Sequence, residues 1–222
     1  MKDNYIHICF VIDSSGSMSG SEGDVIGGFK RLIEEQKAIK EGECSVSLFT
    51  FDSEVKEKYL GVDVNKVDEL DYKPGGMTAM NDGIGIAVDK VGKWLSDMKE
   101  EDRPSKVMLV IMTDGEENFS KEYSLSRVQE MLKHQQEVYN WSVIFQGTDI
   151  TNKKAASDLG IKTMSFTSKL NHFKNYDILN DATTKYRRAA PMVADSVFAC
   201  SLSTDALKLT EEFEEEKSIK IV

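Results

Sequence analysis

The sequence predicts an α/β domain in which helices cover both faces of a doubly wound, mostly parallel sheet. Strand-like and helix-like segments alternate along residues 1–188, an order typical of such three-layer folds. The runs 6–12 and 107–112 contain no Asp, Glu, Lys or Arg, as expected of parallel strands buried on both faces. A short turn at residues 52–54 separates two strand-like segments and predicts one antiparallel edge strand.

Local patterns place each element in order. After the first strand, apolar residues recur at helical spacing over residues 24–40, and charged residues fill the other side. Apolar and polar side chains then alternate in the next strand, and the PGG run at 74–76 marks a loop before the second helix. The predicted strands are 6–12, 44–51, 55–60, 107–112, 141–145 and 163–166, and the predicted helices are 24–40, 82–99, 121–137, 152–158 and about 171–188.

The predicted domain covers residues 1–188, and residues 189–222 are expected to form a C-terminal extension. The periodic patterns weaken after Pro191. The extension also contains the acidic run 211–216, which is typical of a solvated tail. No internal repeat is visible, so we expect one folded domain.

Charge and composition exclude several classes of function. A formal net charge of −10 over 222 residues argues against nonspecific binding to nucleic acid or anionic membranes, which requires dense Lys and Arg. No apolar run approaches the ~20 residues of a membrane-spanning helix, and residues 1–5 lack the apolar stretch of a secretory signal. Cys9, Cys44 and Cys200 lack metal-type spacing, so we expect reduced thiols. The expected location is the cytoplasm.

Three separate segments bring oxygen ligands to expected strand or loop ends. Residues 13–17 (DSSGS) directly follow the first buried strand. Residues 75–82 (GGMTAMND) precede a predicted helix, and residues 112–116 (MTDGE) follow the second buried strand. In doubly wound sheets, ligands bind beyond the carboxyl ends of the strands, where the strand order reverses. We therefore expect the three segments to share one site.

The carboxylates of Asp13 and Asp114 lie side by side if the two buried strands are neighbours. Two carboxylates held close together repel each other, and a bound cation removes that cost. Ser15 and Ser17 alternate with Asp13 around a turn that Gly16 permits, so three oxygens can face one point. Such hard oxygen ligands suit a divalent cation like Mg2+. Each segment alone could also be an ordinary turn or helix cap, but the three together indicate a metal site.

Taken together, the DxSGS run from Asp13, the threonine within residues 75–82 and the TDG run from Thr113 resemble the metal-ion-dependent adhesion site (MIDAS) of the von Willebrand factor A (VWA) family. The three parts occur in the family's order and spacing, and the resemblance covers about residues 5–188. It implies the VWA fold, a Rossmann-like three-layer sandwich. It also implies Mg2+ as the cofactor, with Mn2+ or Ca2+ as alternatives.

The resemblance implies a role for each ligand. Ser15 and Ser17 would coordinate the cation directly through their hydroxyls. Thr78 would bind directly in one state and through water in another, and Asp13 and Asp114 would bind directly or through bridging water. One coordination position stays open, and in the family an acidic residue of a partner fills it. A cation with mostly neutral ligands keeps enough electrophilic character to attract that carboxylate.

The implied function is that of an intracellular protein–protein interaction module rather than an enzyme. Stand-alone VWA proteins of bacterial and phage type are similar in size. Their partners are often AAA+ ATPases of the MoxR kind or components of stress and tellurite-resistance-type systems. Met77, Met80 and Glu116 flank the predicted ligands and form the candidate rim that contacts the partner. Because the chain carries a net charge of −10, the partner should present its acidic ligand within a neutral or basic surface.

A metal-dependent phosphoester hydrolase is the alternative. It would need a general base or nucleophile beside the metal. His7, His134 and His172 are scattered along the chain, and Ser15 stands where aspartate phosphatases carry a second acid. No Walker-type phosphate-binding loop occurs either. The sequence therefore favours binding over catalysis.

Overall fold

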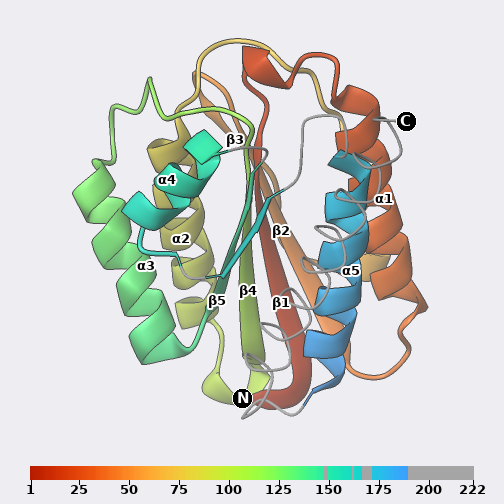
Figure 1. Ribbon diagram of the computed structural model, residues 1–222. Coiled ribbons are helices and arrows are strands. Elements are labelled where there is room, and N and C mark those ends of the chain that lie inside the picture. The colour runs from red at the N-terminus through yellow and green to blue at the C-terminus, as the bar shows by residue number, and fades with distance from the viewer. Residues whose placement is uncertain (148–149, 162, 167–171, 190–222) are drawn as a thin grey trace, which may run out of the picture.

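A six-stranded sheet lies between two layers of helices in the computed structural model of the chain (Figure 1). The structure describes residues 1–147, 150–161, 163–166 and 172–189, so only Ala189 of the predicted C-terminal extension is included. The strands are β1 (Lys2–Asp13), β2 (Glu43–Phe51), β3 (Val55–Asp63), β4 (Pro104–Met112), β5 (Ser142–Gly147) and β6 (Thr163–Phe166). Their order is β3-β2-β1-β4-β5-β6, and only the β2–β3 pair is antiparallel. The predicted fold class, with one antiparallel edge strand, is confirmed.

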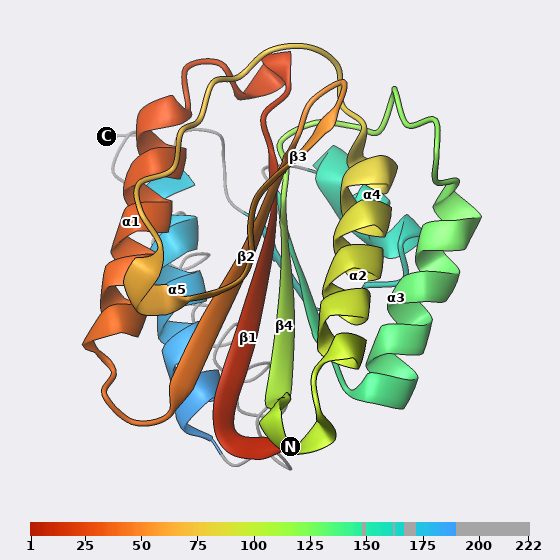
Figure 2. The same ribbon diagram turned by 180° about the vertical axis from the view of Figure 1, so that it is seen from behind.

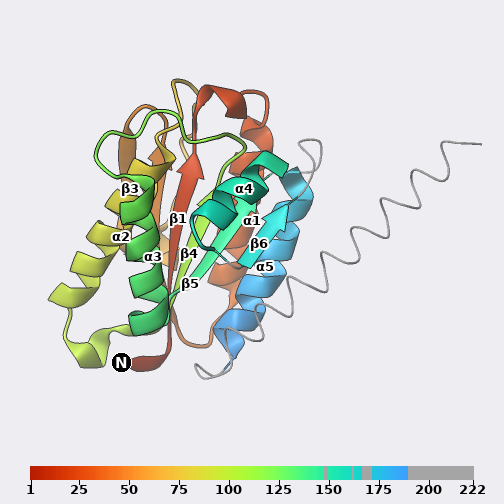
Figure 3. The ribbon, with the colours of Figure 1, turned by 60° about the vertical axis from the view of Figure 1, so that its left-hand side comes forward.

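Helices cover both faces of this sheet. They are α1 (Glu22–Ala38), α2 (Met80–Asp97), α3 (Leu125–Tyr139), α4 (Ile150–Asp158) and α5 (His172–Arg188). Figures 1 and 2 show α1 and α5 on one face and α2, α3 and α4 on the other. Figure 3 shows β6, the edge strand opposite β3, from the side. None of the helices in the described residues is long and apolar enough to cross a membrane.

Side chains of β1 alternate between two hydrophobic cores, one on each face of the sheet. Ile8 and Phe10 belong to the core beneath α1 and α5, whereas Cys9 and Val11 belong to the core beneath α2 and α3. Burial on both faces explains why residues 6–12 of this strand contain no Asp, Glu, Lys or Arg. Cys9 and Cys44 are buried free thiols, as expected, and the third cysteine lies outside the described residues.

Helix α3 begins later than its apolar periodicity predicts. The carboxylate of Asp82 in α2 accepts hydrogen bonds of 2.8–2.9 Å from the backbone N–H groups of residues 121–123. These peptides therefore face α2 instead of forming a first helical turn. The helix starts only after Ser124, whose hydroxyl accepts a hydrogen bond from the backbone N–H of Arg127 at 3.3 Å.

The neighbouring strands β1 and β4 bring two of the predicted ligand segments together. Ile12 and Met112 are register partners, so Asp13 and Thr113 leave the sheet side by side. The strand order reverses at this pair, because β2 and β3 lie beyond β1 while β5 and β6 lie beyond β4. Ligands of doubly wound sheets bind at this position. The expectation that these two strands are neighbours is confirmed.

Candidate metal centre

Three loops meet at the carboxyl end of the sheet (Figure 2). Residues 13–18 follow the body of β1, residues 74–79 precede α2, and residues 113–120 follow β4. The first two loops are joined through their backbones, because Gly16 N donates to Gly76 O at 3.1 Å. The fold therefore gathers all three segments that the sequence singled out.

Side-chain hydrogen bonds join the first loop to the third. Thr113 Oγ1 donates to one carboxylate oxygen of Asp13 at 2.5 Å, and the backbone N–H of Ser15 donates to the other at 2.7 Å. Ser17 Oγ donates to Asp114 Oδ1 at 2.6 Å and lies 3.0 Å from Ser15 Oγ. Four of the predicted ligands thus form one connected group across two loops.

Gly115 marks the point on which the three loops converge. A Cβ atom on this glycine would lie 3.1 Å from Ser17 Oγ, 3.4 Å from Thr78 Oγ1 and 3.7 Å from Asp13 Oδ2. Oxygens from the first and second loops therefore share the space beside the third, and any side chain at Gly115 would enter it. The predicted ligands together are called the five-residue cluster: Asp13, Ser15, Ser17, Thr78 and Asp114.

Most of the five-residue cluster is buried. Asp13 is 0% exposed and Asp114 is 6% exposed, and Ser15 and Thr78 are buried as well, whereas Ser17 is exposed. Burial raises the pKa of the Asp13 carboxyl, and the negative charge of Asp114 raises it further, although hydrogen bonds to the Asp13 carboxylate oppose the rise. A cation beside the two carboxylates would offset the free-energy cost of burying the charged Asp13 carboxylate and the repulsion between Asp13 and Asp114.

The oxygens of this cluster fit a hard divalent cation. Hydroxyls and carboxylates are ligands that Mg2+ and Ca2+ accept, and the cluster contains no nitrogen or sulfur donor. Among the residues that the structure describes, no three His, Cys, Asp or Glu side chains form a group that could hold a metal. A cation at the cluster would depend on the neutral hydroxyls of Ser15, Ser17 and Thr78, and such ligands neutralise little of its charge.

Two residues that support Asp13 were not predicted from the sequence. The hydroxyl of Thr113 orients Asp13, and its position directly before Asp114 in the TDG run could have revealed it. Tyr72 is buried, and its hydroxyl donates to the backbone oxygen of Asp13 at 2.5 Å. Tyr72 lies 59 residues from Asp13 along the chain, so no local sequence pattern predicts their contact.

The predicted rim residues have different environments. Met77 is 46% exposed, and its backbone N–H is held by Ser53 Oγ at 2.9 Å. Glu116 is also exposed. Met80, which the sequence placed on the rim, is only 2% exposed and packs in the core beneath α2. Met80 begins α2 and its side chain is buried in that core, so it does not belong to the exposed rim and the expectation for Met80 is corrected.

A comparison with protein families matches residues 7–184 to the von Willebrand factor type A domain. The chain belongs to this family. The matched region begins in β1 and ends in α5, so it includes the whole of β2–β6. The resemblance inferred from the three segments is thereby confirmed for the family. No curated protein matches the sequence.

Solved structures similar to this VWA chain share its fold. They include the vWF domain of the type V pili tip protein Mfa5 from Porphyromonas gingivalis, with 10% identity, a TM-score of 0.59 and coverage of 86% of this chain and 98% of that one. The PilB minor pilin from Streptococcus sanguinis has 14% identity, a TM-score of 0.57 and coverage of 82% and 62%. Proximal thread matrix protein 1 from the mussel byssus, solved with a zinc-occupied MIDAS motif, has 14% identity, a TM-score of 0.53 and coverage of 89% and 46%. This chain therefore spans less than two thirds of the latter two proteins, and the likeness shows the fold alone.

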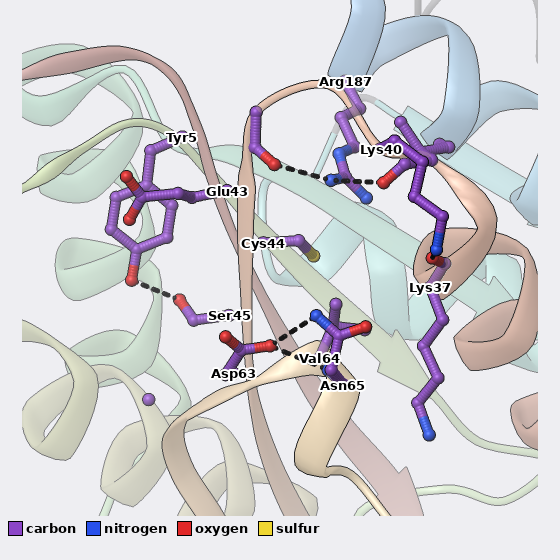
Figure 4. Close-up of a pocket in the computed structure, with 13 residues that line it drawn as sticks. Tyr5, Lys37, Lys40, Glu43, Cys44, Ser45, Asp63, Val64, Asn65 and Arg187 are labelled. Carbon is purple, nitrogen blue, oxygen red and sulfur yellow. Dashed lines mark hydrogen bonds between the residues drawn. The ribbon is translucent and has the colours of Figure 1, made fainter.

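A separate pocket of about 300 Å³ lies at the opposite end of the sheet (Figure 4). Arg187 from α5 and Asp63 from β3 contribute to its walls. The Arg187 guanidinium donates to the backbone oxygens of Gln36 at 2.7 Å and Gly42 at 3.2 Å, and Asp63 accepts from the backbone N–H of Asn65 at 2.8 Å. These charged groups already bond within the chain, so we assign them a structural role.

Proposed function

We propose that this VWA chain is an intracellular protein-interaction module that binds an acidic residue of a partner through a divalent cation held at a MIDAS. The observation that carries the proposal is the convergence of hydroxyl and carboxylate oxygens from three loops on the space beside Gly115. The VWA family match supports it. So does the zinc-occupied MIDAS motif described for the mussel byssus protein.

In this proposal the five-residue cluster holds the cation. The hydroxyls of Ser15, Ser17 and Thr78 bind it, and the carboxylates of Asp13 and Asp114 supply the negative charge around it. The bound cation provides a Lewis-acidic position for an incoming carboxylate. Mg2+ is the proposed resident ion, because hard oxygen ligands dominate the cluster.

Binding is favoured over phosphoester hydrolysis because the carboxylates nearest the proposed cation are already engaged. Both oxygens of Asp13 accept hydrogen bonds from within the chain, and Asp114 accepts one from Ser17. His7 is 0% exposed and packs against Trp94, with ring centroids 4.7 Å apart and the rings tilted, so it lies in the core rather than at the cluster. A hydrolase would need a free base beside the metal.

The proposed partner is a protein that presents an Asp or Glu within a neutral or basic surface. Exposed Glu116 stands at the mouth of the cluster, and the chain's net charge of −10 disfavours an acidic surface around the ligand. Met77 offers an exposed, adaptable apolar contact beside it. An AAA+ ATPase of the MoxR kind and a cytoplasmic location belong to this proposal through the family resemblance.

Partner capture with and without the cation tests the proposal. The immobilised chain is incubated with cell lysate in Mg2+ or in EDTA, and captured proteins are identified by mass spectrometry. We expect one or more proteins that are retained only in Mg2+ and that are lost with Asp13→Ala and with the double variant Ser15→Ala/Ser17→Ala. The control is Asp97→Ala, an exposed carboxylate at the far end of α2. Equal capture in EDTA would contradict a metal-bridged contact.

A further inference from the structure

Asn118 joins the loop that carries Asp114 to the loop that carries Thr78. The backbone N–H of Thr78 donates to Asn118 Oδ1 at 2.9 Å. The backbone N–H of Asn118 donates in turn to the backbone oxygen of Thr78 at 3.0 Å. Both polar groups of the Thr78 backbone are therefore bonded to one residue of the neighbouring loop.

The loop that carries Asn118 is itself firmly attached. The carboxylate of Glu117 accepts hydrogen bonds from the backbone N–H groups of Phe119 at 2.9 Å and Ser120 at 2.8 Å. The same carboxylate accepts a 2.8 Å bond from the backbone N–H of Asn81, in the first turn of α2. Glu117 therefore fixes Asn118 relative to the helix that begins just after Thr78.

Asn118 has no comparable role in the hydrophobic core, because it is exposed. The Asn118 side chain bonds the backbone N–H of Thr78 and not its hydroxyl. The Thr78 hydroxyl points to the cluster, where it would lie 3.4 Å from a Cβ atom added to Gly115. The Asn118 side chain is therefore one of the groups that set the position of this oxygen, and it connects Thr78 to the loop that carries Asp114. Groups that orient a ligand without touching the ion can strongly affect metal affinity.

We propose that Asn118 is a positioning residue for the cation, acting through Thr78. The inference rests on the proposed function, because it assumes that the five-residue cluster binds a divalent ion. The Asn118 side chain holds the Thr78 backbone so that the Thr78 hydroxyl is in place before the ion arrives. Losing that bond leaves only the backbone bond from Asn118 N to Thr78 O between the two residues. The second loop is then held less tightly against the third, and affinity falls without the removal of any ligand.

The test measures Mg2+ affinity in a double-mutant cycle. The melting temperature is followed against MgCl2 concentration, and the dissociation constant is obtained from the Mg2+-dependent increase above the value in EDTA. We expect Asn118→Ala to weaken Mg2+ binding by about tenfold. In a Thr78→Ala background the same change should alter the dissociation constant by less than about twofold, since interacting residues are not additive. Asn65→Ala, in an exposed turn at the other end of the sheet, should change nothing.

The outcomes separate this inference from the proposed function. Equal affinity of the wild type and Asn118→Ala would overturn the role of Asn118 while leaving the MIDAS intact. A tenfold loss in both the wild-type and Thr78→Ala backgrounds would show that Asn118 does not act through Thr78. If Mg2+ fails to stabilise the wild type, or stabilises Ser15→Ala/Ser17→Ala equally, the proposed function fails and this inference fails with it.

Discussion

At the scale of single residues, Gly115 controls the space among the oxygens of the five-residue cluster. A Cβ atom added to Gly115 would lie only 3.1 Å from Ser17 Oγ. The φ angle of Gly115 is not positive, so alanine can adopt the same backbone conformation without strain. Gly92 in α2 differs, because no atom lies within 4 Å of its Cβ position. The two glycines are therefore a matched pair for testing whether that space holds an ion.

We predict that Gly115→Ala weakens Mg2+ binding by more than about tenfold, because the methyl group competes with the ion for the space among its ligands. The melting temperature in EDTA should change little. Gly92→Ala should leave Mg2+ binding unchanged and raise the free energy of unfolding by about 0.5–1 kcal/mol, as expected for a helical glycine. Unchanged Mg2+ affinity in Gly115→Ala would show that the ion binds elsewhere.

His7 gives a prediction about pH. Burial lowers the pKa of His7 to about 3, and the residue is 0% exposed, with Nδ1 2.8 Å from Ser45 Oγ. In the unfolded chain a histidine has a pKa of about 6.5. Below pH 6.5 the imidazole of His7 is therefore protonated in the unfolded state but stays neutral in the folded state. The free energy of unfolding is highest above pH 6.5 and decreases as the pH falls toward the pKa of His7 in the folded state.

Between pH 6.5 and 5 this difference should cost the wild type about 2 kcal/mol of unfolding free energy. We predict that His7→Gln loses correspondingly less over the same range, as measured by urea denaturation at each pH. His134→Gln, at an exposed position on α3, serves as the control and should follow the wild type. Identical pH profiles for His7→Gln and the wild type would contradict the burial of a neutral imidazole.

At the scale of elements, the attachment of the segment 115–124 to α2 decides where α3 begins. The carboxylate of Asp82 accepts hydrogen bonds from three successive backbone N–H groups of that segment. The ring of Tyr123 occupies the space that a Cβ atom on Gly85 would take, so only glycine fits there. Tyr123 OH also donates to Asp89 at 2.7 Å. The segment is therefore held against the helix that supports the second loop of the cluster.

We predict that Asp82→Ala lowers the free energy of unfolding by about 2 kcal/mol, because several partly buried N–H groups lose their acceptor. Urea denaturation measures the change. Asp97→Ala removes an exposed ion pair with Lys93 and should have a negligible effect. A loss in Asp82→Ala no larger than in Asp97→Ala would mean that the carboxylate does not hold the segment.

The sequence predicted the strands and most helices well, because their apolar periods are long and regular. It also predicted that the members of the five-residue cluster lie together, since four of them lie at or just after the ends of β1 and β4 and Thr78 lies in the short loop before α2. It missed the late start of α3 because the competing group, Asp82, lies far away along the chain. It misplaced Met80 for a related reason: the loop motif does not reveal that the helix begins there and turns this side chain inward.

Across the whole molecule, the candidate metal site and the main polar contacts of α5 lie at opposite ends of the sheet. The carboxyl end carries the five-residue cluster, whereas the opposite end attaches α5 to the rest of the domain. There, buried Arg187 bonds the backbone oxygens of Gln36 and Gly42. Buried Lys106 from β4 donates to the backbone oxygens of Arg187 at 2.6 Å and Ala189 at 2.9 Å.

We predict that Arg187→Met lowers the free energy of unfolding by about 2 kcal/mol or more, because carbonyl oxygens at the end of α1 lose a charged donor. Mg2+ affinity should stay within about twofold of the wild type, since the change lies at the other end of the sheet and distant sites act independently. Denaturation and Mg2+ titration of the same sample check both parts. A large loss of Mg2+ affinity would show that the two ends are coupled.

Crystallography with Mn2+ in place of Mg2+ shows whether an ion binds at the five-residue cluster. We predict one strong anomalous peak within about 2.5 Å of the hydroxyls of Ser15 and Ser17, a distance suited to oxygen ligation of a divalent ion. The peak should be absent from crystals of the Ser15→Ala/Ser17→Ala variant. A wild-type crystal with no peak at the cluster, or with its only peak elsewhere, would show that the cluster does not hold the ion.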